Sequence, residues 1–431
     1  MSNPTTRRDF LRLSVAAAAG LATAGRTFAQ KPKSPNDRIR YAIVGVGGKG
    51  WSGTEWAART GDIVALCDID ATTLDQGAEV HPKASKHRDY RRLFEDHHDE
   101  FDAVVISTPD HHHAFASSMA MKQGKHVYCE KPLTRTLGEA RHIINLAKKT
   151  KLATQMGNQG SAESGLRRGA ALIKSGVFGA VKEVHVWTDR PIWPQGVPRA
   201  QSKPVPENVD WDIWLGPSLD RSFGDNYHSF SWRGWWDFGS GALGDMACHY
   251  MNMPFRAADL RDPISVQAKT SGHNRDSFPS SSVITYEFAA TKSRGPVTMV
   301  WYDGRVKPPQ ELAPGVNLAG NGSIVVCEHA TVISREDHSI ELVGGAALPP
   351  VEFEVSPGHM EEFARAIMGG PPALSNFVEY AGPLTETVLL GNLAVWADGS
   401  KLEWDARRQR VKGTREYDSL IRPNYRPGWK L

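Results

Sequence analysis

The stretch Ile39-Arg40-Tyr41-Ala42-Ile43-Val44-Gly45-Val46-Gly47-Gly48-Lys49-Gly50 decides the fold of this chain. Its apolar first half predicts a strand, and Gly45, Gly47 and Gly50 fit the pattern G-x-G-x-x-G. The first glycine allows a tight turn, the second lets a pyrophosphate approach the backbone, and the third packs helix on strand. Because the pattern follows a predicted strand and opens a predicted helix, it indicates a dinucleotide-binding Rossmann domain.

A carboxylate follows the second predicted strand, Ile63–Cys67. Asp68 lies 18 residues beyond Gly50, close to the spacing at which such domains place an acidic residue on the adenosine ribose. This carboxylate would accept hydrogen bonds from the ribose hydroxyls and repel a 2′-phosphate, so it favours NAD over NADP. Asp70, two residues further on, is the alternative for the same role.

Strands and helices alternate from Arg38 to about Met156, which is typical of a doubly wound parallel sheet. The predicted strands are Arg40–Val44, Ile63–Cys67, Ala103–Ser107, His126–Cys129, Leu152–Gln155 and a short one near His87–Tyr90. The predicted helices include Ser52–Thr60, Ala114–Gln123 and Leu137–Lys149. We therefore predict an α/β N-terminal Rossmann domain over residues 38–157.

The pattern changes after Gly157. A predicted helix near Glu163–Ser175 is followed by the strand Val181–Trp187 and a loop rich in Pro and Trp. Alternating apolar runs then predict a mostly antiparallel open sheet, with strands at Ile264–Lys269, Ser282–Phe288, Pro296–Trp301, Gly322–Cys327 and Ala330–Ser334. Helices at Met360–Met368 and Gly382–Asp398 complete an α+β substrate and oligomerisation domain, predicted over residues 158–431.

Composition is that of an ordinary soluble globular protein, with 40% hydrophobic and 23% charged residues in 431. A net charge of +3 gives no reason to expect nucleic acid or an anionic membrane as a partner. The spacing of the four cysteines suits neither a zinc site nor a disulfide framework, so we expect buried free thiols. Many of the thirteen Trp lie between Trp187 and Trp236, where stacking on a sugar and burial in a core are both open.

The first 29 residues predict an export signal rather than part of the fold. Thr6-Arg7-Arg8-Asp9-Phe10-Leu11-Arg12 matches the twin-arginine pattern, and an alanine-rich run from Leu13 to Ala24 follows it. Thr27-Phe28-Ala29 resembles a cleavage site. The twin-arginine pathway carries folded proteins, so we expect a periplasmic protein that leaves with its cofactor bound and has no membrane contact beyond export.

Lys131 lies in Tyr128-Cys129-Glu130-Lys131-Pro132, directly after a predicted strand of the parallel sheet. A lysine there, at the edge of a nucleotide site, can donate a hydrogen bond to a reacting oxygen. Pro132 restricts the backbone as it leaves the sheet. The arrangement points to redox chemistry on a hydroxyl or carbonyl.

Three adjacent histidines occur in Ser107-Thr108-Pro109-Asp110-His111-His112-His113. Neighbours in sequence rarely converge on one metal ion, and no Cys or carboxylate set completes a shell, so we predict no metal. We expect this loop to run along the dinucleotide, with one histidine capping or packing the next helix.

A second chemical cluster lies in Gly241-Ala242-Leu243-Gly244-Asp245-Met246-Ala247-Cys248-His249. The glycines predict a turn into a helix, and the i, i+4 spacing of Asp245 and His249 puts both side chains on one helix face. A histidine beside a carboxylate is a tunable proton acceptor near neutral pH. A helix-capping Asp with a packed His is the alternative when this pair is taken without Lys131.

These motifs resemble the glucose–fructose oxidoreductase, inositol dehydrogenase and rhizopine-catabolism (Gfo/Idh/MocA) family. The matching segments are Gly45–Gly50, Thr108–His113, Glu130-Lys131-Pro132 and Gly244–His249. The resemblance implies a Rossmann domain followed by an open sheet domain, with Lys131, Asp245 and His249 as catalytic residues. The Trp-rich segment Arg233–Ser240 departs from many members and leaves the substrate open.

We predict NAD as cofactor. Its predicted binding residues are Gly45, Gly47, Gly48, Gly50, Asp68, Ser107, Thr108, Pro109, His113, Glu130, Lys131 and Asn158. The resemblance further implies a sugar or polyol substrate and a homodimer or homotetramer.

Three functions compete at this point. In a sugar or polyol oxidoreductase, His249 takes the hydroxyl proton, Lys131 hydrogen-bonds the developing carbonyl, and hydride passes to nicotinamide. In an NAD-dependent glycoside hydrolase or lyase, transient oxidation of the sugar acidifies a ring proton and eliminates the aglycone. A non-catalytic sugar or cofactor sensor is the third, and the intact set of Lys131, Asp245 and His249 argues against it.

Overall fold

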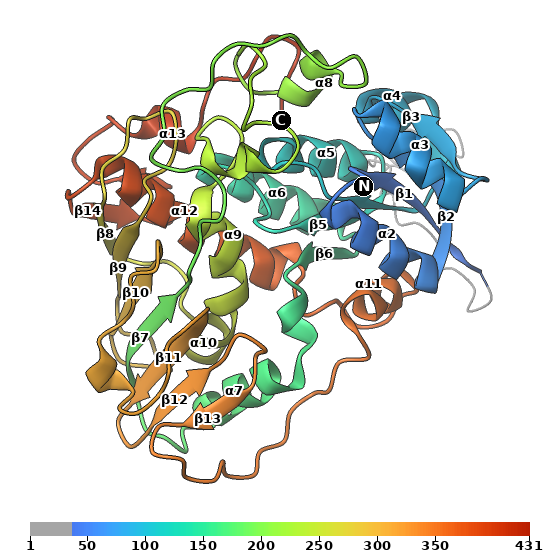
Figure 1. Cartoon of the computed structure of the whole chain (residues 1–431). Coiled ribbons are helices and arrows are strands. Elements are labelled where there is room, and N and C mark those ends of the chain that lie inside the picture. Colours follow the sequence, from blue (N-terminus) through green and yellow to red (C-terminus); the bar gives the residue numbers. More distant parts are fainter. Residues whose placement is uncertain (1–36) are drawn as a thin grey trace, which may run out of the picture. The chain divides into compact units, whose positions relative to one another are not determined.

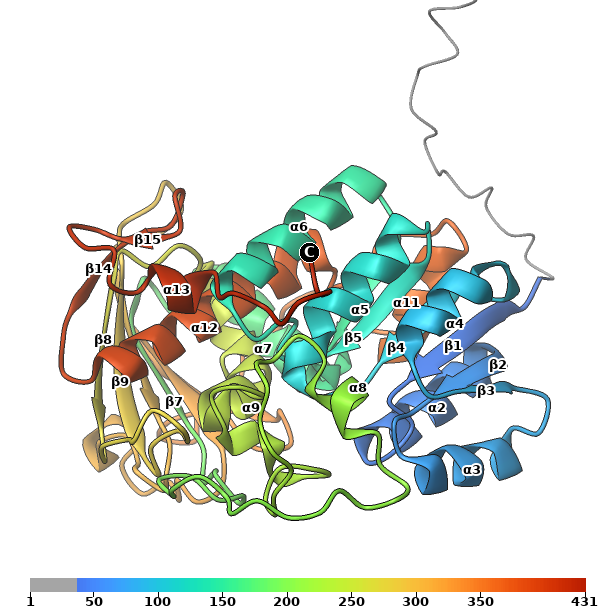
Figure 2. The same ribbon diagram turned by 90° about the horizontal axis from the view of Figure 1, so that it is seen from above.

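The computed structural model describes residues 37–431 of the chain. The predicted export signal, residues 1–29, lies outside the described residues. Two β-sheets organise the described part, and helices pack on both of them (Figures 1 and 2). No helix in residues 37–431 combines the length and apolar character needed to cross a membrane.

The first sheet has six strands in the order β3-β2-β1-β4-β5-β6, and every neighbouring pair is parallel. The strands are β1 (Ile39–Val44), β2 (Gly61–Cys67), β3 (Ser85–His87), β4 (Ala103–Ile106), β5 (His126–Glu130) and β6 (Thr154–Gly157). The strand order reverses between β1 and β4, and ligands of doubly wound sheets bind at such a switch point. This is the predicted Rossmann sheet.

The strand predicted near His87–Tyr90 is misplaced by two residues. β3 ends at His87, and Tyr90 instead begins helix α4 (Tyr90–Asp96). The reason is local: the Asp89 carboxylate accepts a hydrogen bond from the backbone N–H of Arg91 and caps that helix.

Helices cover both faces of this sheet. α2 (Lys49–Thr60) packs with α11 (His359–Ile367) on one face, and α5 (Asp110–Lys122) and α6 (Leu137–Thr150) lie on the other (Figure 2). α3 (Ala71–Val80) follows β2. α5 begins four residues before the predicted Ala114, because Asp110 in its first turn suits the positive end of the helix dipole. The three histidines therefore lie in the helix rather than in the loop.

The second sheet has nine strands in the order β13-β12-β11-β7-β10-β9-β8-β14-β15. β7 and β10 pair in parallel and the other neighbours pair antiparallel, as the sequence predicted for most of the sheet. The strands are β7 (Val181–Trp187), β8 (Ser265–Thr270), β9 (Ser282–Phe288), β10 (Val297–Tyr302), β11 (Gly322–Cys327), β12 (Thr331–Ser334), β13 (Ile340–Leu342), β14 (Leu402–Asp405) and β15 (Arg410–Val411).

Four helices pack on one face of the second sheet: α7 (Ser164–Lys174), α9 (Gly241–Tyr250), α10 (Asn252–Ala258) and α12 (Gly382–Ala397) (Figure 1). Shorter helices are α8 (Trp211–Leu215) and α13 (Asp418–Ile421). α9 is the helix that carries the predicted Asp245 and His249. The four cysteines are free and buried, as expected.

The chain between residues 211 and 238, which includes part of the Trp-rich segment Arg233–Ser240, forms a small core of its own. Trp211, Trp214, Leu215, Tyr227, Trp235 and Phe238 are all buried and pack together. Trp211 and Trp214 stack with ring centroids 4.5 Å apart. For these tryptophans burial in a core, rather than stacking on a sugar, is what the structure shows.

Two segments from the second half of the chain pack back on the first sheet. α11 contributes Met360, Phe363 and Ile367 to the core under β1 and β2. The C-terminal tail places the Tyr425 ring 4.8 Å and the Trp429 ring 5.5 Å from that of Phe115 on α5. The relative placement of the two sheets is thus supported by packing on both sides of the Rossmann sheet.

Candidate active site

A cavity of about 770 Å³ lies at the switch point of the first sheet and reaches α9. Its size is within the usual range of ligand pockets. The glycine loop lines it on the Rossmann side, and Lys131, Asp245 and His249 line it as well. The three predicted catalytic residues, which come from β5 and α9, are therefore brought together in one cavity.

The glycine loop has the geometry that its sequence requires. Gly45 has φ +84°, and a Cβ there would lie 2.8 Å from the carbonyl carbon of Ser107. At Gly50 a Cβ would lie 2.0 Å from the carbonyl oxygen of Gly45, so only glycine lets α2 start this close to β1. At Gly48 nothing lies within 4 Å of a Cβ, which leaves the loop open toward the cavity.

Residues beside this loop fit a bound dinucleotide. The Ser107 and Thr108 hydroxyls and Oε2 of Glu130 are buried without a hydrogen-bond partner, although polar groups of this kind are normally paired. All three residues line the cavity next to the glycine loop. Together with the loop backbone, they would hold NAD and satisfy these groups.

The carboxylates that follow β2 both line the cavity. Asp68 accepts hydrogen bonds from the backbone N–H groups of Val46 (2.8 Å) and Asp70 (3.0 Å). The Asp70 side chain caps α3 and also accepts from Asn208 at 2.8 Å. Both carboxylates are thus engaged locally, and the assignment of the ribose to Asp68 stays a prediction.

Of the predicted cofactor residues, all but Gly50 and Asn158 line the cavity. Gly50 acts through packing, as described above. Asn158 is fully buried, and its amide donates to the carbonyl oxygen of Cys248 at 3.3 Å, so in this structure it supports α9. The sequence predicted that Asn158 lies at the end of β6, but it did not predict the direction of the Asn158 side chain.

Lys131 and Asp245 form a buried ion pair. Nζ of Lys131 donates to Oδ1 of Asp245 at 2.6 Å, and each side chain is 12% exposed. Burial alone would raise the pKa of Asp245, but the positive charges of Lys131 and Arg233 outweigh it and hold that pKa well below its usual value. The pair links the end of β5 in the first sheet to α9 on the second, with both side chains in the cavity wall.

Arg233 extends this pair into a network that sequence reasoning missed. Its Nε lies 3.2 Å from Oδ1 of Asp245, and its Nη1 lies 3.0 Å from Oδ1 of the fully buried Asp110. Ser240 donates to the other oxygen of Asp110. Burial by itself would lower the pKa of Arg233, but the negative charges of Asp110 and Asp245 outweigh it and raise that pKa. The only sequence signal was an arginine in the segment that departs from many family members.

His249 faces the cavity one helical turn beyond Asp245. Burial, reinforced by the positive charge of Lys131, holds the pKa of His249 well below its usual value despite the Asp245 carboxylate. The ring is therefore neutral near pH 7 and able to accept a proton. Asp245 pairs with cations instead of orienting this ring by a hydrogen bond, so its action on His249 is electrostatic.

The ring nitrogens of the three histidines of α5 lie close to backbone carbonyl oxygens, although His112 and His113 also line the cavity. Nε2 atoms of His111 and His112 each lie 2.8 Å from the carbonyl oxygen of Trp214. The ring nitrogens of His113 lie 2.8 Å from the carbonyl oxygens of Pro132 and Thr108, and a neutral ring donates to one of them. Within residues 37–431, no group of three or more His, Cys, Asp and Glu is arranged to hold a metal ion.

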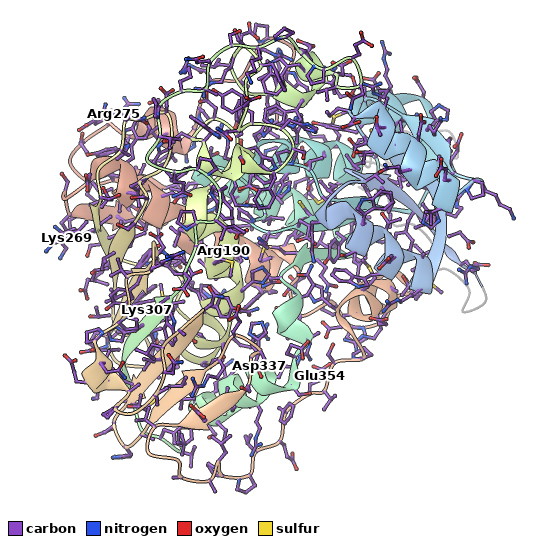
Figure 3. All side chains as sticks on the ribbon, viewed as in Figure 1. Arg190, Lys269, Arg275, Lys307, Asp337 and Glu354 are labelled. Carbon is purple, nitrogen blue, oxygen red and sulfur yellow. The ribbon has the colours of Figure 1, made fainter. Side chains whose placement is uncertain are left out.

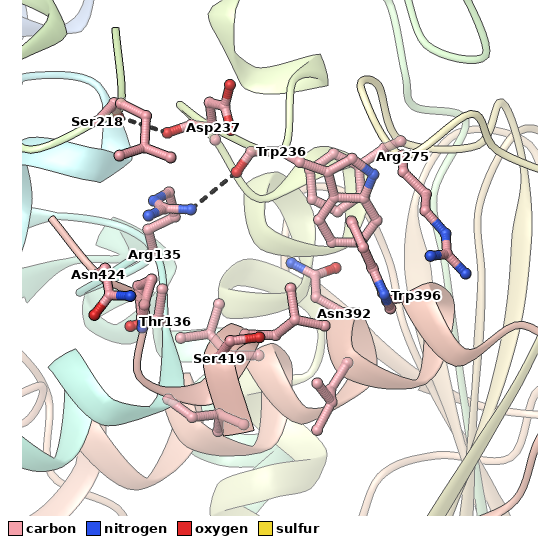
Figure 4. A pocket seen from close by; sticks show the side chains of 18 of the residues that line it. Arg135, Thr136, Ser218, Trp236, Asp237, Arg275, Asn392, Trp396, Ser419 and Asn424 are labelled. Carbon is pink, nitrogen blue, oxygen red and sulfur yellow. Dashed lines mark hydrogen bonds between the residues drawn. The ribbon is translucent and has the colours of Figure 1, made fainter. Parts of the chain in front are cut away.

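A second cavity of about 200 Å³ lies between the Trp-rich segment, α12 and the C-terminal tail (Figure 4). Trp236, Trp396 and Asn392 are among its lining residues, and Arg135 donates to the carbonyl oxygen of Trp236 there. None of the predicted catalytic or cofactor residues lines it. The larger cavity is therefore the candidate active site.

Comparison with known families agrees with this geometry. The NAD-binding Rossmann fold of the oxidoreductase family matches residues 39–158, and that family's C-terminal alpha/beta domain matches residues 170–293. Together the two matches cover more than half of the chain. The chain belongs to the Gfo/Idh/MocA oxidoreductase family. Its N-terminal part is accordingly an NAD-binding Rossmann domain, and its cofactor is NAD.

Curated relatives of the chain match over part of their length. A glycosyl hydrolase family 109 protein of Solibacter usitatus is 37% identical over 163 residues, which are 34% of this chain and 37% of that protein. One of Saccharopolyspora erythraea is 30% identical over 206 residues, 42% of this chain and 45% of that protein. The chain thus matches less than half the length of these relatives.

Several solved structures share the fold of this chain. The WlbA dehydrogenase of Bordetella pertussis, in complex with NADH and UDP-GlcNAcA, has a TM-score of 0.62 at 17% identity, covering 86% of this chain and 99% of that one. An inositol dehydrogenase homologue of Azotobacter vinelandii, with NADH and myo-inositol, has a TM-score of 0.58 at 17% identity, covering 86% and 98%. At these identities the likeness is one of fold.

The buried histidines predict a loss of stability in mild acid. Burial lowers the pKa of His112 and of His359 to about 4. Below about pH 6.5 these histidines bind protons in the unfolded chain but not in the native state. The free energy of unfolding therefore decreases as the pH is lowered from about 6.5 to about 4, by roughly 1.4 kcal/mol per pH unit for each histidine. Urea denaturation at pH 7.5, 6.5 and 5.5 should show this fall.

In the His359→Gln variant the same fall should be shallower. The exposed His329 gives a matched control, because His329→Gln should keep the slope of the unsubstituted protein. A slope that is equal in all three proteins would contradict the neutral, buried state of His359.

Proposed function

We propose that this protein is an NAD-dependent oxidoreductase that acts on a hydroxyl group of a sugar, glycoside or polyol. The proposal rests on one observation: Lys131, Asp245 and His249 line the same cavity as the glycine loop. A reacting hydroxyl between these side chains would lie beside the place where the residues fit NAD. Bound NAD would accept the hydride, a proton with two electrons, that leaves the carbon.

Each residue then has a distinct task. His249 is neutral and accepts the hydroxyl proton. Lys131 donates a hydrogen bond to the same oxygen as it becomes a carbonyl, and Asp245 fixes the position of the Lys131 ammonium. Arg233 helps to keep Asp245 ionised.

The substrate class rests on the family. The solved neighbours named above were crystallised with UDP-GlcNAcA and with myo-inositol, one a sugar derivative and the other a polyol. The cavity also has aromatic walls suited to the apolar faces of a sugar, since Trp193, Trp232 and Tyr250 line it.

An NAD-dependent glycoside hydrolase or lyase is the second candidate, and the names of the curated relatives favour it. In that reaction the sugar would be oxidised transiently by NAD with the help of the same residues, the acidified ring proton would leave with elimination of the aglycone, and the hydride would return from the NADH formed to the product. Product analysis separates the two functions. Release of the aglycone from a nitrophenyl glycoside without net change in the redox state of NAD supports the hydrolase, and an oxidised sugar supports the dehydrogenase.

Replacement of Lys131 by Ala should lower turnover by about 10²–10⁴-fold, the scale for loss of an electrostatic or proton-transfer group. Bound NAD should remain, because the glycine loop is untouched. His249→Ala should behave in the same way. The exposed Lys122, at the end of α5, gives the control: Lys122→Ala should keep full turnover. Near-normal turnover in Lys131→Ala would remove Lys131 from the mechanism.

We also propose that the protein is exported in the folded state with NAD bound, since residues 1–29 carry a twin-arginine pattern. Outside the cytoplasm a cofactor cannot be exchanged with a free pool, so it must be reduced and reoxidised in place. Protein purified without added nucleotide should therefore contain about one NAD or NADH per chain and keep it through dialysis. Cofactor-free protein that needs added NAD for each turnover would contradict this proposal.

A further inference from the structure

Arg190 presents a guanidinium group to the active-site cavity without a close partner. It follows β7, lines the cavity, and has a side chain that is 33% exposed (Figure 3). Its Nε is buried and has no hydrogen bond, and no other residue of the described chain, 37–431, hydrogen-bonds its guanidinium. The nearest carboxylate oxygen is Oδ2 of Asp245, at 3.7 Å.

The charge of Asp245 is already balanced by two closer cations, so it does not neutralise the Arg190 guanidinium. Nζ of Lys131 lies 2.6 Å and Nε of Arg233 lies 3.2 Å from Oδ1 of Asp245. Arg233 also donates a hydrogen bond to Asp110, and Lys131 donates one to Asp245. Of these three cations, Arg190 alone has no hydrogen bond to a carboxylate of the described residues.

The remaining acidic groups of the cavity wall form no ion pair with Arg190 within residues 37–431. Glu130 accepts a hydrogen bond from Gln159 at 2.9 Å, and Asp70 caps α3. Glu336 accepts a hydrogen bond from Asn321 at 2.7 Å and forms no ion pair with Arg190 within the described residues. Asp68, which follows β2, accepts hydrogen bonds from the backbone N–H groups of Val46 in the glycine loop and of Asp70. Lys49 at the glycine loop lines the same cavity, and Arg88 donates to the carbonyl oxygens of Ile69 and Asn208. Arg190 instead lies beside Asp245, where the substrate would react.

We propose that Arg190 binds an oxyanion of the substrate, so that the substrate is an acidic sugar, either a sugar carboxylic acid or a sugar phosphate. This inference rests on the proposed function, because it requires a sugar beside Lys131 and Asp245. A guanidinium offers two parallel N–H groups to a carboxylate or phosphate, and such charge-assisted pairs are strong and directional. Arg190 is then a specificity residue that selects acidic over neutral sugars and sets the position of the reacting carbon.

Calorimetric titration of the protein with its NAD bound tests this inference. The probes are D-glucuronate, D-glucose 6-phosphate and D-glucose, each at pH 7.5 and low ionic strength. At least one acidic sugar should bind more tightly than glucose, and the tighter of the two identifies the anion as carboxylate or phosphate. In Arg190→Ala the affinity for that acid should fall by about 10–100-fold, the usual effect of a lost hydrogen bond to a charged group, while the affinity for glucose changes by less than about threefold.

Two further variants sharpen the result. Arg190→Lys keeps the charge but loses the paired N–H groups, so its affinity for the acid should lie between those of the other two proteins. Lys269 is exposed on β8 and outside the cavity, so Lys269→Ala makes the same change in net charge and should bind the acid normally (Figure 3).

Two outcomes would overturn the inference. Equal losses for acid and glucose in Arg190→Ala would mean that Arg190 only positions Asp245, and no preference for either acid over glucose would mean that it binds no substrate anion. Because the readout is binding, it is separable from the proposed function. An acid that binds through Arg190 but is never oxidised would refute the oxidoreductase and leave the Arg190 assignment standing.

Discussion

The buried carboxylate of Asp245 is the constraint on which the rest of the site depends. An isolated charge in this position would cost several kcal/mol, and partners that are close and hydrogen-bonded offset that cost. Asp245 finds them in Lys131 at the end of β5 and in Arg233 before α9, with Arg190 after β7 at a longer distance. One carboxylate thereby fixes segments from both sheets around the cavity.

The aromatic residues around Arg233 help to hold this arginine in the network. Arg233 must be held in place to reach both Asp110 and Asp245, and its neighbour Trp235 is fully buried in the small aromatic core. The Arg233 guanidinium also lies over the ring of Trp232, 4.3 Å from its centroid. Large, rigid side chains around a single arginine keep its charge at a defined position in a region without sheet structure.

The sequence predicted both sheets apart from β13, β14 and β15, and it singled out the three candidate catalytic residues that line one cavity, because these follow from local patterns. The glycine fingerprint after β1 and the i, i+4 spacing on α9 are visible without tertiary structure. Arg233 and Arg190 were not predicted, because only the tertiary structure brings them to the site. Arg233 contacts Asp110 and Asp245, and Arg190 lies beside Asp245 although the two are distant in sequence. The hydrogen bond from the Asn158 amide to Cys248 was not predicted either, because the position of a residue at a strand end does not determine which acceptor its buried amide contacts.

A double-mutant cycle on Lys131 and Asp245 tests most directly whether this ion pair organises the site. The free energy of unfolding of the NAD-bound protein is measured for Lys131→Met, Asp245→Asn and the double variant. If the pair is formed as described, the double variant should be more stable than the sum of the single effects implies, by at least about 1 kcal/mol. Lys131→Met removes the closest cation of Asp245 and leaves Arg233, and Asp245→Asn removes the carboxylate that pairs with the Lys131 ammonium. Additivity within about 0.5 kcal/mol would show that the two groups do not depend on each other and would contradict the account.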